Sequence, residues 1–511
     1  MPEVEPQDLD VATWLASGDA FAGRDPVRRV DTHAASIFLT GARAWKLKRP
    51  VNLGYLDFST ADKRKAALEA ELRLNVRTAP GLYRSLHPIS RDAHGHLQID
   101  GTGDPIDWLL EMVRFPDDAL LERVAGRGEL NDGLLLMLAD SIVTFHAGAS
   151  VCADGEGASR LRKIVVGNAI GMARFPDVLD AGRAQALSQR LFARIDAQAA
   201  LLDARARSGR VRHCHGDLHL ANIALLDGIP TPFDCLEFDA ALATTDVLYD
   251  LAFLLMDLWE RGLRNAANSV FNRYLDLSGE DEAGVGLIAM FMAIRATIRA
   301  HVLAAATAGQ GDTKETAAHA RHYLALAETL VAPYEARLVA IGGLSGSGKS
   351  TLARAIGGAI GGAPGARILR SDVLRKRRAG IRPETRLPPS AYTEQASVAV
   401  YKEIEQLAAT MLEADMGVIA DAMFARPDER EAIARIAGDE GARFDGLWLK
   451  VPDGVRIQRV VDRPPEASDA DAEVARAQSL QHGSDPTDWV ILDASASLDV
   501  LRSTALQMLG A

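Results

Sequence analysis

Cysteine is scarce in this sequence, which has three in 511 residues. Cys152, Cys214 and Cys235 are widely separated and form no Cys-x-x-Cys pair, so the sequence predicts neither a disulfide framework nor a zinc site. The N-terminal stretch is acidic and lacks the basic and apolar regions of a signal peptide. We therefore expect a protein that works in the reducing cytoplasm.

Long apolar runs are also missing. The most apolar stretches, residues 251–258 and 287–298, are interrupted by Asp257 and Arg295. Neither approaches the run of about 20 apolar residues that spans a bilayer. We expect no membrane-spanning segment.

Basic residues are fewer than acidic ones, 57 against 69, which gives a formal net charge of −12. This balance disfavours a protein whose main task is to coat nucleic acid or an anionic membrane. Hydrophobic residues make up 48% of the chain, and no low-complexity tract interrupts it. The length therefore predicts about two to four globular domains.

A polar loop within residues 213–239 carries the chemistry of the first two thirds of the chain. Asp217 and Asn222 lie close together in it, and Asp234 follows a hairpin-like spacer. In phosphoryl transfer, one aspartate orients the acceptor hydroxyl and takes its proton, while an asparagine and a second aspartate hold magnesium on the nucleotide phosphates. We assign these roles to Asp217, Asn222 and Asp234 in that order. A polar hairpin whose carboxylates only cap turns is the alternative.

Residues 215–222, His-Gly-Asp-Leu-His-Leu-Ala-Asn, resemble the HGDxHxxN catalytic loop of the aminoglycoside phosphotransferase and choline kinase family. The resemblance implies a bilobal protein-kinase-like fold, with an N-lobe over about residues 25–115 and a C-lobe over about residues 116–332. The glycine that usually follows the metal-binding aspartate is replaced here by Cys235-Leu236-Glu237. This departure leaves open the alternative that one half of the chain is a regulatory nucleotide sensor.

The predicted N-lobe contains two candidates for the lysine that binds nucleotide phosphates. Residues 35–39 and 44–47 predict two strands joined by a turn. In the kinase fold, a strand lysine contacts the phosphates and a helix glutamate holds it. Lys46 and Lys48 lie on the same face of their strand, and we prefer Lys46. Glu71, on a helix predicted over residues 60–77, resembles the paired glutamate, with a solvated helix face as the alternative.

Three further expectations concern single positions of this half. Backbone groups near Glu111 to Val113, where the last N-lobe strand ends, are expected to bind adenine. His146 has no partner visible in the sequence, and we interpret it as a structural histidine. Asp246 and Asp250 are expected to cap a helix and to anchor the catalytic loop.

A second nucleotide-binding pattern begins after a predicted buried strand at residues 337–341. It reads Gly-Leu-Ser-Gly-Ser-Gly-Lys-Ser from Gly343 to Ser350 and satisfies GxxxxGK[ST] between a strand and a helix. In this context the loop amides cradle phosphates, Lys349 reaches the β and γ groups, and Ser350 binds magnesium. The nucleotide-binding residues predicted here are Gly343, Ser345, Gly346, Ser347, Gly348, Lys349, Ser350 and Thr351.

Downstream residues distinguish among the many proteins that use such a loop. The segment 371–375 reads Ser-Asp-Val-Leu-Arg, a buried strand ends at Asp421, and arginines occur at positions 459 and 463. Residues 338–500 thereby resemble P-loop kinases of the polynucleotide kinase, zeta-toxin and gluconate kinase group. The resemblance implies that Asp372 is the base, Arg375 holds an acceptor phosphate and Asp421 assists magnesium or the acceptor. Arg459 and Arg463 would clamp the transferring phosphoryl group.

A basic segment follows the second predicted strand of this half. It indicates either an anionic acceptor or a solvated helix face. Aromatic residues for base stacking are scarce there, so a 5′-hydroxyl nucleic-acid kinase is the less favoured alternative. The basic residues are Arg370, Arg375, Lys376, Arg377, Arg378, Arg382 and Arg386.

The sequence as a whole predicts a chain of two fused kinase domains. Residues 1–332 are expected to form the protein-kinase-like α+β domain, and residues 333–511 a P-loop α/β domain with a mostly parallel sheet. We expect both domains to use ATP and Mg²⁺ and to phosphorylate hydroxyl groups of small molecules, with an anionic acceptor as a possibility for the second.

Overall fold

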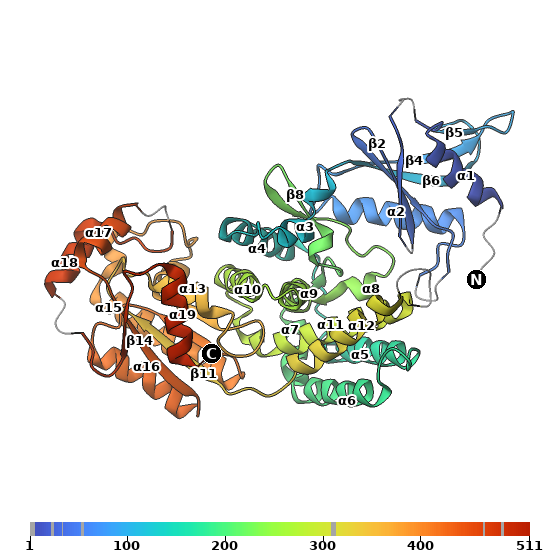
Figure 1. Ribbon diagram of the computed structural model, residues 1–511. Coiled ribbons are helices and arrows are strands. Elements are labelled where there is room, and N and C mark those ends of the chain that lie inside the picture. Colours follow the sequence, from blue (N-terminus) through green and yellow to red (C-terminus); the bar gives the residue numbers. More distant parts are fainter. Residues whose placement is uncertain are drawn as a thin grey trace. The chain divides into compact units, whose positions relative to one another are not determined.

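The computed structural model shows two compact units built from alternating stretches of the chain (Figure 1). Unit 1 comprises Met1–Leu130, Thr144–Ala153 and Gly209–Asp250, and unit 2 comprises Asn131–Val143, Asp154–Ser208 and Leu251–Ala511. The structure describes residues 6–21, 25–32, 34–52, 56–307, 313–462, 466–481 and 485–510.

Unit 1 is built on a six-stranded sheet with the strand order β1-β2-β3-β6-β4-β5. All neighbouring strands in it are antiparallel. Its strands are β1 (Arg28–Asp31), β2 (Ala35–Thr40), β3 (Arg43–Lys48), β4 (Tyr83–Arg91), β5 (Leu97–Ile99) and β6 (Pro105–Val113). The two strands predicted around residues 35–47 are confirmed as the β2–β3 hairpin.

Two helices of unit 1 accompany this sheet, α1 (Pro6–Ser17) and α2 (Ala61–Asn75). Helix α2 begins after Thr60, whose side chain accepts a hydrogen bond from the Lys63 amide at 3.3 Å, as an N-cap residue does. Leu68 of α2 packs with Leu110 of the sheet in an apolar cluster. Helix α2 is therefore fixed at its start by a cap and along its length by the core.

The catalytic-loop region of unit 1 consists of short elements. Strands β8 and β9 form a hairpin whose turn residues, Asp227 and Gly228, both have positive φ, which the Asp-Gly pair favours. Strands β7 and β10 form a second antiparallel pair. These elements are η1 (Asp117–Ala119), α3 (Leu121–Gly126), β7 (Val211–His213), η2 (Leu220–Asn222), β8 (Ile223–Leu226), β9 (Ile229–Pro232), α8 (Ala240–Ala243) and β10 (Thr244–Asp246).

The first part of unit 2 is helical. Residues 282–306 are long and apolar enough to cross a membrane by length and composition, but 67% of their most apolar window is buried inside the protein, as in a core helix. Helices α4 and α9 include residues of both units. The helices are α4 (Asp132–Gly148), α5 (Gly157–Ala173), α6 (Ala181–Ala197), α7 (Ala199–Arg207), α9 (Val247–Glu260), α10 (Arg264–Ser278), η3 (Glu282–Leu287), α11 (Ile288–Ala306) and α12 (Thr313–Leu330).

The second part of unit 2 contains a five-stranded sheet with the order β12-β13-β11-β14-β15. Every neighbouring pair is parallel, so the predicted parallel α/β fold is confirmed. Its strands are β11 (Arg337–Gly342), β12 (Arg367–Arg370), β13 (Val418–Asp421), β14 (Arg443–Lys450) and β15 (Val490–Asp493).

Helices pack around this parallel sheet, where α13 contacts α19 and α15 contacts α16 (Figure 1). Buried strand residues such as Val339 and Ile341 share one apolar cluster with helix residues such as Leu352. Parallel strands buried in this way read as nearly continuous hydrophobic runs. The helices are α13 (Lys349–Gly357), α14 (Ser371–Arg378), η4 (Pro389–Tyr392), α15 (Glu394–Glu413), α16 (Pro427–Asp439), α17 (Asp453–Asp462), α18 (Ala472–Gln481) and α19 (Leu498–Leu509).

A buried ion-pair cluster joins this sheet to the preceding helices of unit 2. Arg367, at the start of β12, is fully buried. Its guanidinium lies 2.7 Å from Asp276 and 2.7 Å from Glu282, and it donates to Asn272 Oδ1 at 3.0 Å. These partners precede the predicted domain boundary at residue 333. Because a buried charge must be paired, the cluster fixes β12 against α10 and η3.

We predict that Arg367→Leu destabilises unit 2 by about 3–5 kcal/mol, because it leaves Asp276 and Glu282 without their main cation. Urea unfolding of the full chain measures this. The control is Arg378→Leu, which removes a half-exposed ion pair with Glu403 and should cost at most about 1 kcal/mol. Equal unfolding midpoints for Arg367→Leu and wild type would contradict the prediction.

Candidate active sites

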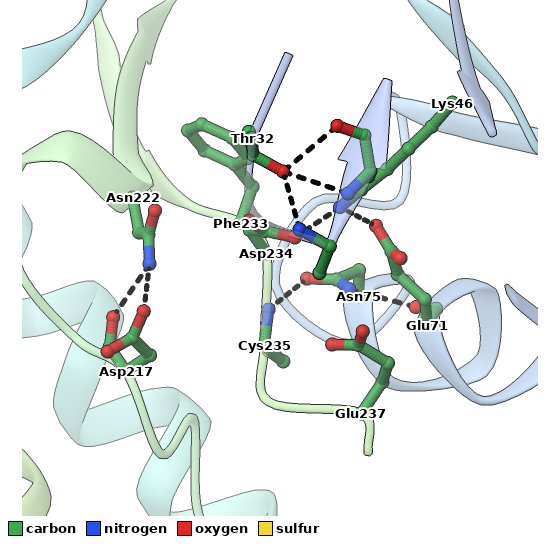
Figure 2. Close-up of polar contacts among 12 residues, drawn as sticks. Thr32, Lys46, Glu71, Asn75, Asp217, Asn222, Phe233, Asp234, Cys235 and Glu237 are labelled. Atoms are coloured by element: carbon green, nitrogen blue, oxygen red, sulfur yellow. Dashed lines mark hydrogen bonds and ion pairs between the residues drawn. The ribbon is translucent and has the colours of Figure 1, made fainter. Parts of the chain in front are cut away.

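Lys46 lies at the centre of a buried ion-pair network in unit 1 (Figure 2). Its Nζ is 2.6 Å from Glu71 Oε1 on α2 and 2.7 Å from Asp234 Oδ1, which follows β9. Burial alone would lower the pKa of Lys46, but the carboxylates of Asp234 and Glu71 outweigh it and raise that pKa well above its usual range. Lys46 therefore stays charged between two acids.

Lys48 forms an ion pair with the other carboxylate oxygen of Glu71. Its Nζ is 2.7 Å from Glu71 Oε2 and 2.5 Å from Glu237 Oε1. Glu71 is fully buried, so the alternative of a solvated helix face is wrong. Of the two lysines, Lys46 is the one that forms an ion pair with Asp234. This geometry agrees with the preference for Lys46 as the nucleotide lysine, which remains a prediction.

Asp217, the predicted base, forms a second polar pair with Asn222. Asn222 Nδ2 donates to Asp217 Oδ2 at 2.8 Å and to the Asp217 carbonyl at 3.0 Å. In Figure 2 this pair lies beside the segment that carries Asp234. The negative charge of Asp217 acts to raise the pKa of Asp234, although Lys46 and Lys48 leave that pKa lowered overall despite burial. The structure thus brings the three predicted phosphotransfer residues into one neighbourhood.

Asp250, at the end of unit 1, holds the backbone of the catalytic loop. Its carboxylate accepts hydrogen bonds from the amides of His215 at 3.1 Å and Gly216 at 2.8 Å. His146 Nε2 lies 3.1 Å from the same carboxylate. The prediction that Asp250 anchors this loop is therefore confirmed. His146 has a buried partner in Asp250, and its structural role stays a prediction.

Gly216 is required at its position in the loop. Its φ is +83°, and a Cβ added there would lie 2.8 Å from Leu236 Cβ. The amide of Leu236 in turn donates to the His215 carbonyl at 2.9 Å. The catalytic loop and the segment after Asp234 therefore touch closely, which only glycine permits.

The sequence analysis missed the two residues that orient the Asp234 segment. The Asp234 amide donates to Tyr83 Oη at 3.1 Å, and the Cys235 amide donates to Asn75 Oδ1 at 2.8 Å. Asn75 also donates to the Glu71 carbonyl at 2.8 Å. No local pattern marks Asn75 or Tyr83, because their partners lie more than a hundred residues away. Cys235 is buried here, so this segment is ordered without the usual glycine.

The structure shows how one of the backbone groups near Glu111 to Val113, which are predicted to bind adenine, is engaged. Strand β6 pairs with β3 on one side and with β4 on the other. The Val113 amide donates to the Leu82 carbonyl at 2.8 Å, and the Glu111 carboxylate lies 3.3 Å from Arg43. The Val113 N–H is therefore engaged within the sheet and is not a donor for adenine.

The phosphate-binding loop of unit 2 lies between β11 and α13. Gly343, Gly346 and Gly348 have φ values of +138°, +86° and +96°, a conformation that other residues rarely adopt. Lys349 Nζ donates to the Gly343 carbonyl at 2.8 Å. Ser350 Oγ donates to Asp421 Oδ2 at 2.5 Å, so the two predicted magnesium ligands are adjacent.

A cavity of about 1290 Å³ opens over this loop. It brings together residues that the sequence separates by more than a hundred positions. Gly343 and Ser347 are not part of its lining, and Arg463 lies outside the described residues. The predicted residues that line it are Ser345, Gly346, Gly348, Lys349, Ser350, Thr351, Asp372, Arg375, Asp421 and Arg459.

Asp372 and Arg375 lie on α14 with different surroundings. Burial raises the pKa of Asp372, against the lowering effects of Ser468 and Arg370, so its proton affinity is that of a stronger base than an ordinary aspartate. Arg375 already donates to the Ala391 carbonyl at 2.8 Å and to Ser397 Oγ at 3.3 Å. Both terminal nitrogens of the Arg375 guanidinium therefore donate hydrogen bonds within the protein.

Arg456, which the sequence analysis did not single out, ties the helices above the cavity to the loop. This residue of α17 is buried, and its Nη1 donates to the Ser345 carbonyl at 2.8 Å. Its Nη2 donates to the Ala475 carbonyl of α18 at 2.8 Å. The Ser345 amide donates to Gln478 Oε1 of α18 at 2.9 Å. Both α17 and α18 thus contact the phosphate-binding loop directly.

The basic segment after β12 divides into paired and cavity-lining residues. Arg377 and Arg378 form ion pairs with Glu403, each at 3.1 Å. Lys376 Nζ lies 2.9 Å from Asp469, and Arg382 pairs with Asp140. Arg370, Arg375 and Arg386 line the cavity, where Arg386 pairs with Asp471 and Arg370 Nε lies 3.6 Å from Asp421 Oδ2.

Comparison with known proteins identifies both halves. Residues 119–285 match the model of the phosphotransferase enzyme family, and residues 338–483 match the model of an AAA domain. An uncharacterized protein of Mycobacterium tuberculosis and one of Mycobacterium bovis are each 30% identical to this chain over 467 residues, 90% of this chain and 90% of theirs. The chain belongs to the same family as these mycobacterial proteins.

Solved structures resemble each half of this family member separately. A choline/ethanolamine kinase family protein from Mesorhizobium loti is 13% identical, covers 63% of this chain and 94% of its own, and gives a TM-score of 0.38. The APS kinase of Mycobacterium tuberculosis is 18% identical, covers 35% of this chain and 100% of its own, and gives a TM-score of 0.28. The family models confirm the resemblances predicted for the two halves.

We predict that Asp250→Asn loosens the catalytic loop of this family member. Asparagine keeps the shape of the side chain, but its amide nitrogen cannot accept a hydrogen bond, so one buried N–H loses its acceptor at a cost of about 1–3 kcal/mol. Amide exchange at His215 and Gly216 should accelerate by about 10- to 100-fold. The control is Asp239→Asn, which replaces the cap of α8 with an equally good one and should leave these amides unchanged. Unchanged exchange in Asp250→Asn would refute the anchoring role.

Proposed function

We propose that this chain is a bifunctional ATP-dependent phosphotransferase, with kinase domains at residues 1–332 and 333–511. Each domain would transfer the γ-phosphate of ATP to a hydroxyl group of a small-molecule acceptor, with Mg²⁺ as the second cofactor. The observation that supports this proposal is that each unit brings together residues for which phosphotransfer roles are predicted. The first set centres on Lys46 and Asp217, and the second on Lys349 and Asp372.

The donor atoms of the first site suit the proposed cofactors. Asn222 and Asp234 offer amide and carboxylate oxygens, the ligands that Mg²⁺ prefers. Bound magnesium ATP would supply the phosphoryl group and neutralise charge that develops on it. Lys46 would hold the phosphates, oriented by Glu71. Asp217 would orient the acceptor hydroxyl and take its proton, with its carboxylate positioned by Asn222.

The second site offers an equivalent set on an unrelated fold. Loop amides from Ser345 to Gly348 would bind the phosphates, and Lys349 would reach the terminal groups. Ser350 and Asp421, which already share a hydrogen bond, would hold Mg²⁺. Asp372 would accept the proton of the acceptor hydroxyl, and Arg459 would contact the transferring group.

The environment of the basic segment supports a small-molecule acceptor over a nucleic acid. Lys376, Arg377, Arg378 and Arg382 form ion pairs with acidic residues of unit 2. Charges neutralised in this way contribute little to the counterion release that drives nucleic-acid binding. An acceptor that enters the cavity itself would meet Asp372.

We predict two ATP sites that single substitutions remove one at a time. In calorimetric titration with Mg²⁺ and the non-hydrolysable analogue AMPPNP, wild type should bind two equivalents. Lys46→Met and Lys349→Ala should each weaken one site by at least about tenfold, because a lysine–phosphate contact worth about 1.4 kcal/mol or more is lost. Lys48→Met should change affinity by less than about threefold, because Lys46 remains to contact the phosphates.

ATP turnover in the same variants tests catalysis at each site and separates the proposal from a nucleotide sensor. Two catalytic sites predict that Lys46→Met and Lys349→Ala each remove part of the turnover and that the double variant removes all of it. If one single variant abolishes turnover and the other leaves it intact, one half is a sensor. A larger effect of Lys48→Met than of Lys46→Met would reverse the assignment of the nucleotide lysine.

A further inference from the structure

Three asparagines of α10 form a row along one face of that helix. Asn265, Asn268 and Asn272 follow one another at helical spacing, so their side chains are neighbours. Asn268 and Asn272 are buried. Helix α10 contacts α13, β12 and α14, and all four elements belong to unit 2. We call these three residues the asparagine row.

Strand β12 has an edge that the asparagine row reaches. It is the first strand in the order β12-β13-β11-β14-β15, so one of its edges has no neighbouring strand in the part of the chain that the structure describes. The Arg367 amide points toward β13 and donates to the Gly417 carbonyl at 2.8 Å. The amide of the next residue, Ile368, points to the opposite edge. Such an edge presents N–H and C=O groups that need partners.

Asn272 pairs with this edge as a neighbouring strand would. Its Oδ1 accepts a hydrogen bond from the Ile368 amide at 2.7 Å, and its Nδ2 donates to the Ala366 carbonyl at 3.0 Å. One side-chain amide thus serves a donor and an acceptor of the strand, as a backbone peptide group does. Arg367 Nη1 donates to the same Oδ1 at 3.0 Å, which holds the amide of Asn272 in this orientation.

The other two asparagines bond backbone groups on either side of this contact. Asn268 Nδ2 donates to the Ala366 carbonyl at 2.8 Å. Asn265 Nδ2 donates to the Ala355 carbonyl at 2.9 Å, and its Oδ1 accepts from the Gly358 amide at 3.2 Å. Ala355 and Gly358 lie at the C-terminal end of α13, where backbone carbonyls lack partners within the helix. The row therefore holds both β12 and α13.

Glycines allow α10 to approach the P-loop domain this closely. A Cβ added to Gly357 would lie 2.2 Å from Asn268 Oδ1, and one added to Gly365 would lie 2.8 Å from Asn268 Nδ2. A Cβ added to Gly358 would lie 2.6 Å from Asn265 Oδ1. Any other residue at these positions would push the helix away. The two surfaces therefore match in shape as well as in hydrogen bonding.

The strand that the row holds leads directly to the proposed base of the second site. Strand β12 runs without a break into α14, where Asp372 lies about one helical turn beyond Ile368. A shift of β12 along its edge would therefore move Asp372. Helix α10 itself lies within residues 119–285, which match the phosphotransferase enzyme family. A segment of one family thus supports the strand that carries the proposed base in the other.

We propose that the asparagine row is a docking surface for the P-loop domain, that it takes the place of a neighbouring strand along β12, and that Asn272 is a positioning residue for Asp372. The inference rests on the proposed phosphotransferase function of that domain. Asparagine is a poor helix former, and its amide is costly to bury without hydrogen bonds, which the P-loop domain supplies here. The P-loop site therefore depends on residues that precede position 333.

Amide exchange in the full chain tests the docking surface. Asn272→Ala keeps a good helix former in α10 but removes the acceptor of the Ile368 amide, so exchange in residues 366–370 should accelerate by at least about tenfold. Asn272→Asp keeps an acceptor for that amide and should accelerate exchange less than Asn272→Ala does. The matched control is Ser269→Ala, which lies on the same helix outside the row and should leave exchange in residues 366–370 unchanged.

ATP turnover tests the positioning role while the first site is silenced by Lys46→Met. With an extract of small metabolites as the source of acceptors, turnover that depends on Lys349 then reports the P-loop site alone. Adding Asn272→Ala should lower kcat by at least about tenfold, because Asp372 is displaced. AMPPNP affinity at this site should change by less than about threefold, because Asn272 contacts β12 and not the phosphate-binding loop. Asn272→Asp should restore part of kcat, and Ser269→Ala should not change it.

Each part of the inference has its own contrary result. Unchanged exchange in Asn272→Ala would overturn the docking surface. Accelerated exchange with unchanged kcat, or a loss of AMPPNP affinity as large as the loss of kcat, would overturn the positioning role. If the Lys46→Met parent shows no turnover that depends on Lys349, the proposed function of the P-loop domain is wrong, and the exchange measurement still decides whether the row is a docking surface.

Discussion

The buried ammonium group of Lys46 is the constraint on which the first site depends. It lies 2.6 Å from Glu71 and 2.7 Å from Asp234, which come from a helix and a loop that are far apart in the sequence. Removing a charge from water is costly, and good geometry with both acids offsets that cost. The same ion pairs therefore fix β3, α2 and the Asp234 segment relative to one another. Asn75 and Tyr83 complete this arrangement by holding the backbone around Asp234.

Charge is arranged differently in the second site, where a glycine-rich loop lies between β11 and α13 and arginines line the cavity. Arg456 binds the loop to α17 and α18, and Arg367 binds β12 to the helices that precede the P-loop domain. Both arginines are buried, and both terminal nitrogens of each have partners within unit 2. The arginines that line the cavity retain unused donors, notably Arg370.

Features set by local chain geometry were predictable from sequence. The glycine-rich loop between β11 and α13, the β2–β3 hairpin and the parallel sheet were predicted because short patterns encode them. Contacts between distant segments were not predictable from sequence. The roles of Asn75 and Arg456 were therefore not predicted. The bond from the Val113 N–H to the Leu82 carbonyl was not foreseen for the same reason, because a sequence does not show that a strand is paired on both edges. Likewise, only the folded structure shows which basic residues after β12 are exposed and which form ion pairs.

The most direct test of the account is phosphate transfer from γ-labelled ATP into a fractionated extract of small metabolites, with the products identified by mass spectrometry. Wild type is compared with Asp217→Asn and Asp372→Asn, which remove the proposed base of one site each. The account predicts two different sets of products, one lost in each variant. If one set of products is lost in both variants, or if neither variant loses any product, the claim of two independent phosphotransfer sites is wrong.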